Sequence, residues 1–176
     1  VLETIVVQGA GGDSDAKSIV ATNASSVSKM ATDILDTPAS VSVITAKEIE
    51  QRGATSVEEV LQYTPGVSTD FYGSDDRYDF FKIRGFDAYT YRDGLALGRP
   101  FGAAREETYA FERVEVLKGA NSTSGVSDPG GSVNLVTKTP KSERFGEAYV
   151  TGGVNNRAET GVDFGDNITD DDTLSY

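Results

Sequence analysis

The sequence of 176 residues contains no cysteine and no histidine. The missing cysteine excludes a disulfide scaffold and thiolate metal ligands, and the missing histidine excludes imidazole ligands and the Ser-His-Asp and Cys-His types of catalysis. Iron or another metal can therefore enter only through oxygen ligands or inside a bound complex. We expect no cofactor, no metal site of the protein's own, and no catalytic residues, because the Asp and Glu residues are scattered over turns and form no acid-base pair.

Basic residues and long apolar runs are also scarce. Lys and Arg number 16 against 28 Asp and Glu, and the resulting formal charge of -12 repels a nucleic-acid backbone. No stretch approaches the ~20 apolar residues of a membrane helix, and no basic stretch followed by an apolar one marks a signal peptide. Either the protein is soluble, or a signal has been removed and any membrane contact is made by strands.

The N-terminal part consists of two segments that differ in composition. Residues 1–7 form a short apolar stretch, and residues 8–30 are rich in Gly, Ala, Ser and Asp without apolar periodicity. Such a composition has little to bury, so we expect a flexible tether there.

A strand and two helices are predicted next. Val41–Ile44 alternates as a strand does, and Thr45–Glu48 is a capping box that opens a helix stopped by Gly53. A second capping box, Ser56–Glu59, opens another helix that ends before Pro65–Gly66.

Short strand candidates separated by turn residues follow the helices. They are residues 67–71, 80–84, 113–118 and 132–138. We therefore expect residues 31–142 to form an α+β domain with a small, mixed, four-stranded sheet and short helices.

The pattern changes again after Pro140, where apolar and polar residues alternate in two stretches joined near Asn155–Asn156. This pattern in residues 143–176 predicts two strands with one apolar and one polar face each. A third strand starts after the acidic turn 170–172, so we expect further strands beyond Tyr176. The alternative is an ordinary hairpin packed on the preceding domain.

Six stretches in one order resemble the plug domain of TonB-dependent outer-membrane receptors, especially those for siderophores. They are Thr37–Ile44, Glu58–Val67, Ile83–Phe86, Asp93–Gly94, Phe111–Gly119 and Pro129–Lys138. The chain departs from the family at residues 119–125, where the usual Pro and Tyr are missing and Ser124 replaces the Tyr. The N-terminal stretch also resembles the family's TonB box, which comprises Glu3, Thr4, Ile5, Val6 and Val7.

The resemblance implies a plug inside a 22-stranded transmembrane barrel, with residues 143–176 as its first strands. It implies a receptor in the outer membrane of a Gram-negative bacterium that binds and imports a ferric siderophore. The expected partners are a TonB-type energy-transducing protein at the N-terminal box and outer-membrane lipid around the barrel. The open alternatives are another cargo, such as cobalamin, haem, a sugar or a metal chelate, or a plug-like soluble periplasmic binding module.

Two sets of site residues follow from the resemblance. Arg84, Arg113 and Glu115 are predicted to latch the plug to acidic groups of the barrel wall, because a buried guanidinium needs a carboxylate partner; a salt bridge within the plug is the alternative. Residues 71–111 hold 11 of the 16 aromatic residues, and loops in this region are expected to contact the cargo. The predicted cargo contacts are Tyr72, Arg99, Phe101 and Tyr109.

Overall fold

The computed structural model describes residues 17–71, 73, 77–99, 104–120, 128–141, 143–154, 156–169 and 174–176. It divides into two compact units, residues 1–137 and 138–176. The division falls between Thr137 and Lys138, whereas the sequence analysis placed it after residue 142. No helix in the described ranges is long and apolar enough to cross a membrane.

The first unit is built on a mixed, five-stranded sheet with the order β3-β9-β10-β7-β8. Its strands are β3 (Ser40–Thr45), β7 (Tyr89–Arg92), β8 (Leu95–Gly98), β9 (Phe111–Lys118) and β10 (Gly131–Thr137). The β7–β10 pair is parallel, and the other three pairs are antiparallel. The α+β plug fold is confirmed, but the expected count of four strands is wrong, because the hairpin β7–β8 completes the sheet.

Two of the predicted strands belong to a separate sheet. Its order is β4-β5-β6, with β4 at Val67–Thr69, β5 at Phe81–Ile83 and β6 at Phe86–Asp87. Gly130 packs against the turn after β5 so closely that a Cβ there would meet the Ile83 carbonyl oxygen at 2.1 Å. Glycine is required at this position because the loop before β10 passes directly over the β5 backbone.

Both predicted N-cap hydroxyls are found, whereas the Glu59 carboxylate accepts from the Thr55 amide and the Glu48 carboxylate binds Arg52. Helix α2 (Ala46–Arg52) begins at Thr45, whose hydroxyl accepts from the Glu48 amide, and ends at Gly53 with a φ of 63°. Helix α3 (Val57–Leu61) begins at Ser56, whose hydroxyl accepts from the Glu59 amide. These side chains satisfy amides that the first helical turn leaves unpaired.

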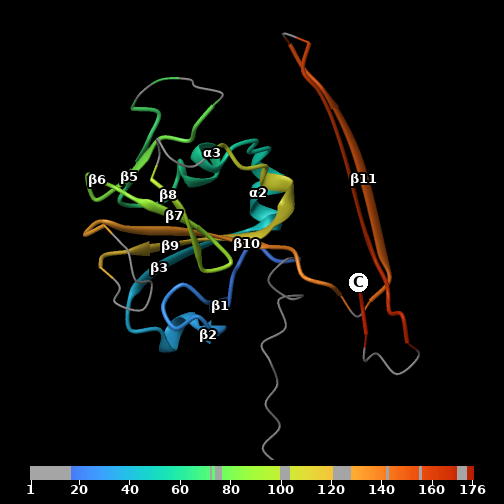
Figure 1. Ribbon diagram of the computed structural model, residues 1–176, viewed down its shortest axis with the longest axis horizontal. Helices are drawn as coiled ribbons and strands as arrows, with labels where there is room; N and C mark the ends of the chain where they lie inside the picture. Colours follow the sequence, from blue (N-terminus) through green and yellow to red (C-terminus); the bar gives the residue numbers. More distant parts are fainter. Residues whose placement is uncertain are drawn as a thin grey trace, which may run out of the picture. The chain divides into compact units, whose positions relative to one another are not determined.

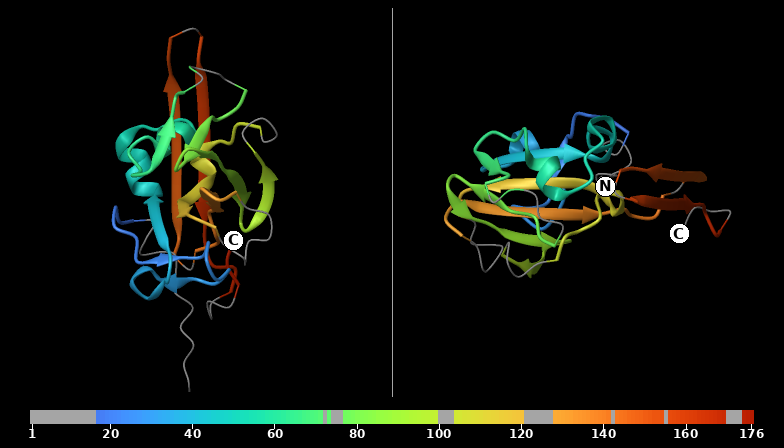
Figure 2. Two further views of the ribbon diagram at one scale, coloured as in Figure 1. Left: turned by 90° about the vertical axis from the view of Figure 1, so that its left-hand side faces the viewer. Right: turned by 90° about the horizontal axis from the view of Figure 1, so that it is seen from above.

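The helices and the N-terminal segment lie on opposite faces of the five-stranded sheet (Figures 1 and 2). Helices α2 and α3 cover one face, where the core residues are buried. The core includes Ile44, Ile49, Val60, Leu61, Phe81, Ile83, Val114, Val116, Val133 and Leu135. The other face carries the small hairpin of β1 (Asn23–Ala24) and β2 (Thr32–Asp33), followed by the 3-10 turn η1 (Ile34–Asp36).

The second unit contains the antiparallel strands β11 (Phe145–Gly152) and β12 (Ala158–Gly165). Tyr149 lies opposite Gly161, and a Cβ at Gly161 would meet the Tyr149 ring at 2.0 Å. On the other face of the pair, Val150 and Val162 are 82% and 69% exposed. The strands therefore have the alternating polar and apolar faces that the sequence predicts.

Candidate functional site

Arg99 follows β8 directly, and protein groups hold its guanidinium. Nε donates to Oδ2 of Asp128 at 3.2 Å, and Nη2 donates to Oδ1 at 2.8 Å. The guanidinium also lies over the Tyr89 ring, with 5.1 Å between Cζ and the ring centroid. Asp128 can pair with Arg99 because it lies just before β10, at the same end of the sheet. The side chain is still 55% exposed, so the pairing fixes its direction and leaves much of it accessible.

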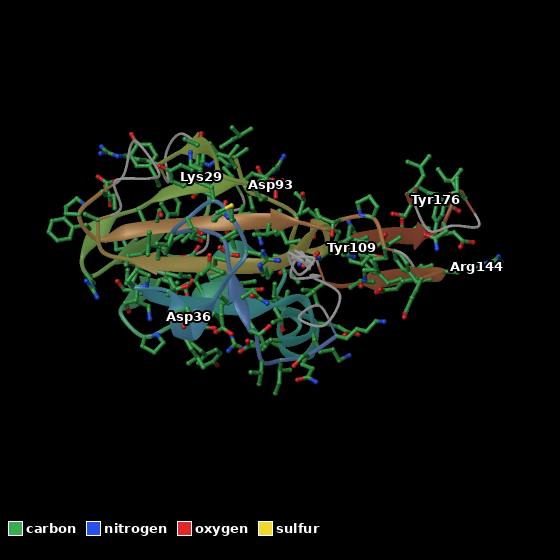
Figure 3. The ribbon with its side chains drawn as sticks, turned by 90° about the horizontal axis from the view of Figure 1, so that it is seen from below. Lys29, Asp36, Asp93, Tyr109, Arg144 and Tyr176 are labelled. Atoms are coloured by element: carbon green, nitrogen blue, oxygen red, sulfur yellow. The ribbon has the colours of Figure 1, made fainter. Side chains whose placement is uncertain are left out.

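Tyr109 lies at the opposite end of the sheet from Arg99. It belongs to the 3-10 turn η2 (Thr108–Ala110) just before β9, whose first residue pairs with Thr137 at the end of β10. Arg99 follows Gly98, which lies next to Thr90 and therefore near the start of β10. The five residue steps from Ser132 to Thr137 span about 17 Å of strand. Arg99 and Tyr109 therefore do not share one binding surface. Figure 3 shows Tyr109 at its end of the sheet.

The remaining predicted cargo and partner contacts lie outside the described residues. They are Tyr72, Phe101, Glu3, Thr4, Ile5, Val6 and Val7.

Arg84 does not lie in a strand. It is exposed in the turn after β5, with a φ of 53°, so the prediction of a strand-borne, buried guanidinium is wrong. A Cβ at Gly119 would lie 3.4 Å from Arg84 Nη1, which places this group beside the end of β9. Burial lowers the pKa of Lys118 there, and the charge of Arg84 lowers it further. Within the described part of the chain, neither cation pairs with a carboxylate, and Lys118 instead donates to Ser42 Oγ at 2.8 Å.

Arg113 and Glu115 form an ion pair within the plug, as the alternative reading allowed. Arg113 Nε donates to Glu115 Oε1 at 2.8 Å, and Nη1 donates to Glu112 Oε1 at 2.9 Å. The Arg113 side chain is 10% exposed and that of Glu115 is fully buried. At this depth each charge needs the other, because either one left alone would be strongly destabilising.

Glu115 also binds the N-terminal segment, and sequence reasoning missed this contact. The Ser25 amide donates to both carboxylate oxygens at 3.0 Å, and the Ser26 amide donates to Oε2 at 2.7 Å. Both serine hydroxyls bind the same carboxylate. Residues 25–29, here named the strap, are thus attached to strand β9 through Ser25 and Ser26, although the sequence pattern assigned them to the tether. No local pattern signals the contact, since its partners are 90 residues apart.

Two further buried carboxylates connect α3 to the chain between β4 and β5. Glu58 accepts from the Asp70 amide at 2.5 Å and from the Phe80 amide at 3.4 Å, and Asp79 accepts from the Glu58 amide at 3.3 Å. Burial raises the pKa of Glu58 and the pKa of Asp79, and backbone hydrogen bonds oppose the rise. Their role is to satisfy buried amides, a structural one.

The described residues contain no group of three or more His, Cys, Asp or Glu residues placed to hold a metal ion. What the first unit offers instead is an arginine fixed beside an aromatic ring at one end of the sheet, a pair of adjacent cations beside β9, and a docked N-terminal strap.

Comparison with known proteins identifies the family. The model of the TonB-dependent receptor plug domain family matches residues 33–133. The chain is 38% identical over 168 residues to the ferrichrome outer membrane transporter/phage receptor of Escherichia coli K12, covering 92% of the chain and 22% of the transporter. It is 33% identical to the ferrioxamine B receptor of Salmonella typhimurium, covering 86% of the chain and 23% of the receptor.

Solved structures agree. The alcaligin outer membrane receptor FauA of Bordetella pertussis matches 96% of the chain with a TM-score of 0.74 and 26% identity, and the chain covers 30% of that receptor. The chain thus spans between about a fifth and a third of the length of these relatives. It belongs to the TonB-dependent receptors of the Gram-negative outer membrane and carries their plug domain.

Proposed function

We propose that the protein binds a ferric siderophore at the cell surface and imports it, and that it performs no chemistry on this cargo. The main support for this proposal is the 38% identity to a ferrichrome transporter across 92% of the chain. The plug blocks the barrel at rest and is moved by an energy-transducing partner. Iron stays inside its chelate, so the protein needs contacts to the chelate and no ligands to the metal.

We propose residues 1–7 as the TonB box, with Glu3–Val7 as the part that the TonB-type partner binds, and the following residues as its tether. An extended segment can add as a strand to a partner's sheet edge, where backbone hydrogen bonds supply the affinity. The strap then lies between the pulled terminus and the plug, because Ser25 and Ser26 bind Glu115 of β9.

The cargo-facing end of the plug is the end with Arg99. Its guanidinium is oriented by Asp128 and stacked on Tyr89, which suits an oxygen-rich chelate surface. Tyr72 and Phe101 are proposed as further contacts from the neighbouring loops. Tyr109 is dropped from this surface because it lies at the other end of the sheet.

The proposed latch to the barrel wall consists of Arg84 with Lys118 beside it, while Arg113 and Glu115 bind each other. Two adjacent cations without a carboxylate partner in the described residues favour an acidic group from the wall. The exposed apolar face of β11 and β12, with Val150 and Val162, is proposed to contact outer-membrane lipid.

The function is tested by expressing the full-length receptor in a bacterium that lacks its own ferrichrome and ferrioxamine receptors. We expect uptake of radioactive iron from ferrichrome or ferrioxamine B, with growth on that source alone. If the cells neither bind nor take up ferrichrome or ferrioxamine B, import of these two siderophores is contradicted.

The Ile5→Pro variant tests the TonB box. Proline removes a backbone donor from the extended segment, so surface binding of the ferric siderophore should persist while uptake stops. Val1→Pro, outside the proposed contact, is the matched control. Normal uptake by a well-expressed Ile5→Pro receptor would sink the assignment.

A further inference from the structure

A cavity of about 350 Å³ lies within the second unit, at the end of the strand pair where β11 begins and β12 ends. Its volume falls within the ~300–1,000 Å³ typical of small-molecule sites. Phe164 and Tyr176 line it, and their rings make an edge contact with 6.1 Å between the centroids. Arg144 and Asp166 supply its charged groups. Arg144 and Tyr176 lie in the same part of this unit in Figure 3.

The cavity lies where the apolar face of the strand pair ends. Val150, Val162 and Phe164 on this face are 82%, 69% and 64% exposed. Asp166 follows two positions after Phe164, and Arg144 directly precedes β11. A band of exposed apolar side chains that ends at a tyrosine and at charged groups is typical of a strand surface at the membrane–water boundary.

The two charged groups face each other without forming a direct hydrogen bond. Arg144 Nε lies 3.6 Å from Asp166 Oδ2, beyond the ~2.7–3.2 Å of an N–H···O hydrogen bond. The Arg144 side chain is 86% exposed, and Asp166 is its one ion-pair partner among the residues that the structure describes. Asp166 Oδ1 accepts from the Asn167 amide at 2.9 Å, which orients the carboxylate. The cavity therefore presents one positive and one negative group to a ligand.

A zwitterionic headgroup with a phosphate and a primary ammonium matches this pair of charges. The phosphate accepts hydrogen bonds from the planar guanidinium of Arg144. The ammonium donates hydrogen bonds to the Asp166 carboxylate. An anionic headgroup would leave Asp166 beside a phosphate with no ammonium to compensate, and a quaternary ammonium has no N–H to donate.

We propose that this cavity binds the headgroup of phosphatidylethanolamine, with Arg144 holding the phosphate and Asp166 holding the ammonium. The acyl chains lie along the apolar face beside Phe164. This inference rests on the proposed lipid contact of β11 and β12, and it adds a site and a lipid class to that contact. Binding there anchors the strand pair at the membrane boundary, whichever cargo the receptor carries.

The test uses the purified full-length receptor in detergent, mixed with equal amounts of three lipids that share the same acyl chains. Phosphatidylethanolamine offers both charges, phosphatidylglycerol offers only the phosphate, and phosphatidylcholine offers the phosphate and a quaternary ammonium. Native mass spectrometry measures how much of each lipid the receptor retains. A further sample receives glycerophosphoethanolamine, which has the same headgroup without acyl chains.

Three variants separate the two charges from a general effect of charge removal. Arg144→Gln removes the cation of the cavity. Asp166→Asn removes the anion and keeps an oxygen acceptor for the Asn167 amide. Arg157→Gln is the matched control, because Arg157 is a half-exposed arginine at the opposite end of the pair, bound to Glu159 at 2.9 Å. Heat-modifiable migration in gel electrophoresis checks that each barrel is folded.

We expect the parent to retain phosphatidylethanolamine about threefold better than either other lipid, a factor in keeping with exposed ion pairs. Arg144→Gln should lower the retention of phosphatidylethanolamine to the level of phosphatidylcholine. Asp166→Asn should abolish the preference for phosphatidylethanolamine over phosphatidylglycerol, and Arg157→Gln should behave as the parent does. Glycerophosphoethanolamine at equal concentration should displace no lipid, because it lacks the chains that contact the apolar face.

Equal retention of the three lipids by the parent would overturn the headgroup site. A folded Asp166→Asn receptor with the parental preference would overturn it as well, and so would an equal loss in the Arg144→Gln and Arg157→Gln receptors. A parent that retains none of the lipids contradicts the proposed lipid contact itself. Siderophore import is measured separately by iron uptake, so its failure is distinguished from a failure of the lipid site.

Discussion

The two faces of the five-stranded sheet are made by alternate residues of the same strands, yet their chemistry is opposite. Towards α2 and α3, β9 and β10 present fully buried apolar residues: Val114, Val116, Val133 and Leu135. Towards the strap they present mostly polar residues, Arg113, Glu115, Ser132 and Asn134, together with Leu117 and Val136. The first face is held by burial, which has no direction. The second also uses hydrogen bonds from Ser25 and Ser26 to one carboxylate, which depend on distance and direction.

The largest effect on stability is expected from a substitution that removes a large buried side chain on the helix face of the sheet. Phe81 is 1% exposed and belongs to the core, so Phe81→Ala should cost about 3–5 kcal/mol of the free energy of unfolding. Urea unfolding followed by circular dichroism measures it. Leu35→Ala, at a side chain that is 92% exposed, should cost less than about 0.5 kcal/mol. Equal costs for the two variants would remove the distinction between core and surface.

Glu115→Gln tests the strap face. The amide keeps the shape but loses the charge, and a cost of about 2 kcal/mol is expected because hydrogen bonds to a charged group are lost while Arg113 keeps its ion pair with Glu112. Hydrogen exchange at the Ser25 and Ser26 amides should become faster, while exchange at the Val60 amide, which donates to the Ser56 carbonyl inside the helix layer, should stay slow. Retained protection of both serine amides would mean that Glu115 does not hold the strap.

Removing the side-chain cap of helix α3 should have a smaller effect on stability. Ser56→Ala removes the hydroxyl that accepts from the Glu59 amide at 3.1 Å, with an expected cost of about 1 kcal/mol. Ser68→Ala on the exposed side of β4 is the control, with no measurable change in the urea midpoint. A Ser56→Ala protein as stable as the control would show that the cap contributes nothing here.

The smallest effect is the pH dependence of stability, which comes from carboxyl groups that are buried on the helix side of the sheet. Burial raises the pKa of Asp79 above its ordinary 3.8. Between the unfolded and the folded pKa the folded state holds more protons, so this group's contribution to stability falls as pH rises through that window. Asp79→Asn keeps the acceptor for the Glu58 amide and removes the titration. The variant should gain stability over the parent at pH 7, with the gain fading towards pH 4; a constant difference at both values would contradict the sign.

Local features were predicted well from the sequence. The N-cap hydroxyls of Thr45 and Ser56, the stop at Gly53 and the strands β9 and β10 each depend on residues a few positions apart. The hairpin β7–β8 was missed although Asp93–Gly94 between two alternating stretches is a hairpin signal; the aromatic residues around it were read as loop. The count of four strands was wrong for this reason and because two of the candidates, β4 and β5, belong to a separate sheet.

The site was predicted less well for a physical reason. A sequence can place Arg99 in a turn, but it cannot place Asp128 beside it, because the loop before β10 must first return to the same end of the sheet. Likewise, Arg99 and Tyr109 are close in sequence and lie at opposite ends, since one follows β8 and the other precedes β9, and both strands run antiparallel to β10 and therefore in the same direction.

The sequence by itself determined the family, the α+β class, the helix caps and the alternating strands, because these are written in short-range patterns of residue type and spacing. Only the tertiary structure decided which charges pair. Arg113 bound Glu115 inside the plug, Arg84 came to lie beside Lys118, and the strap docked on a carboxylate 90 residues away. A charge interacts with whatever the folded chain brings within a few ångströms, and that neighbourhood is fixed by strand order and register.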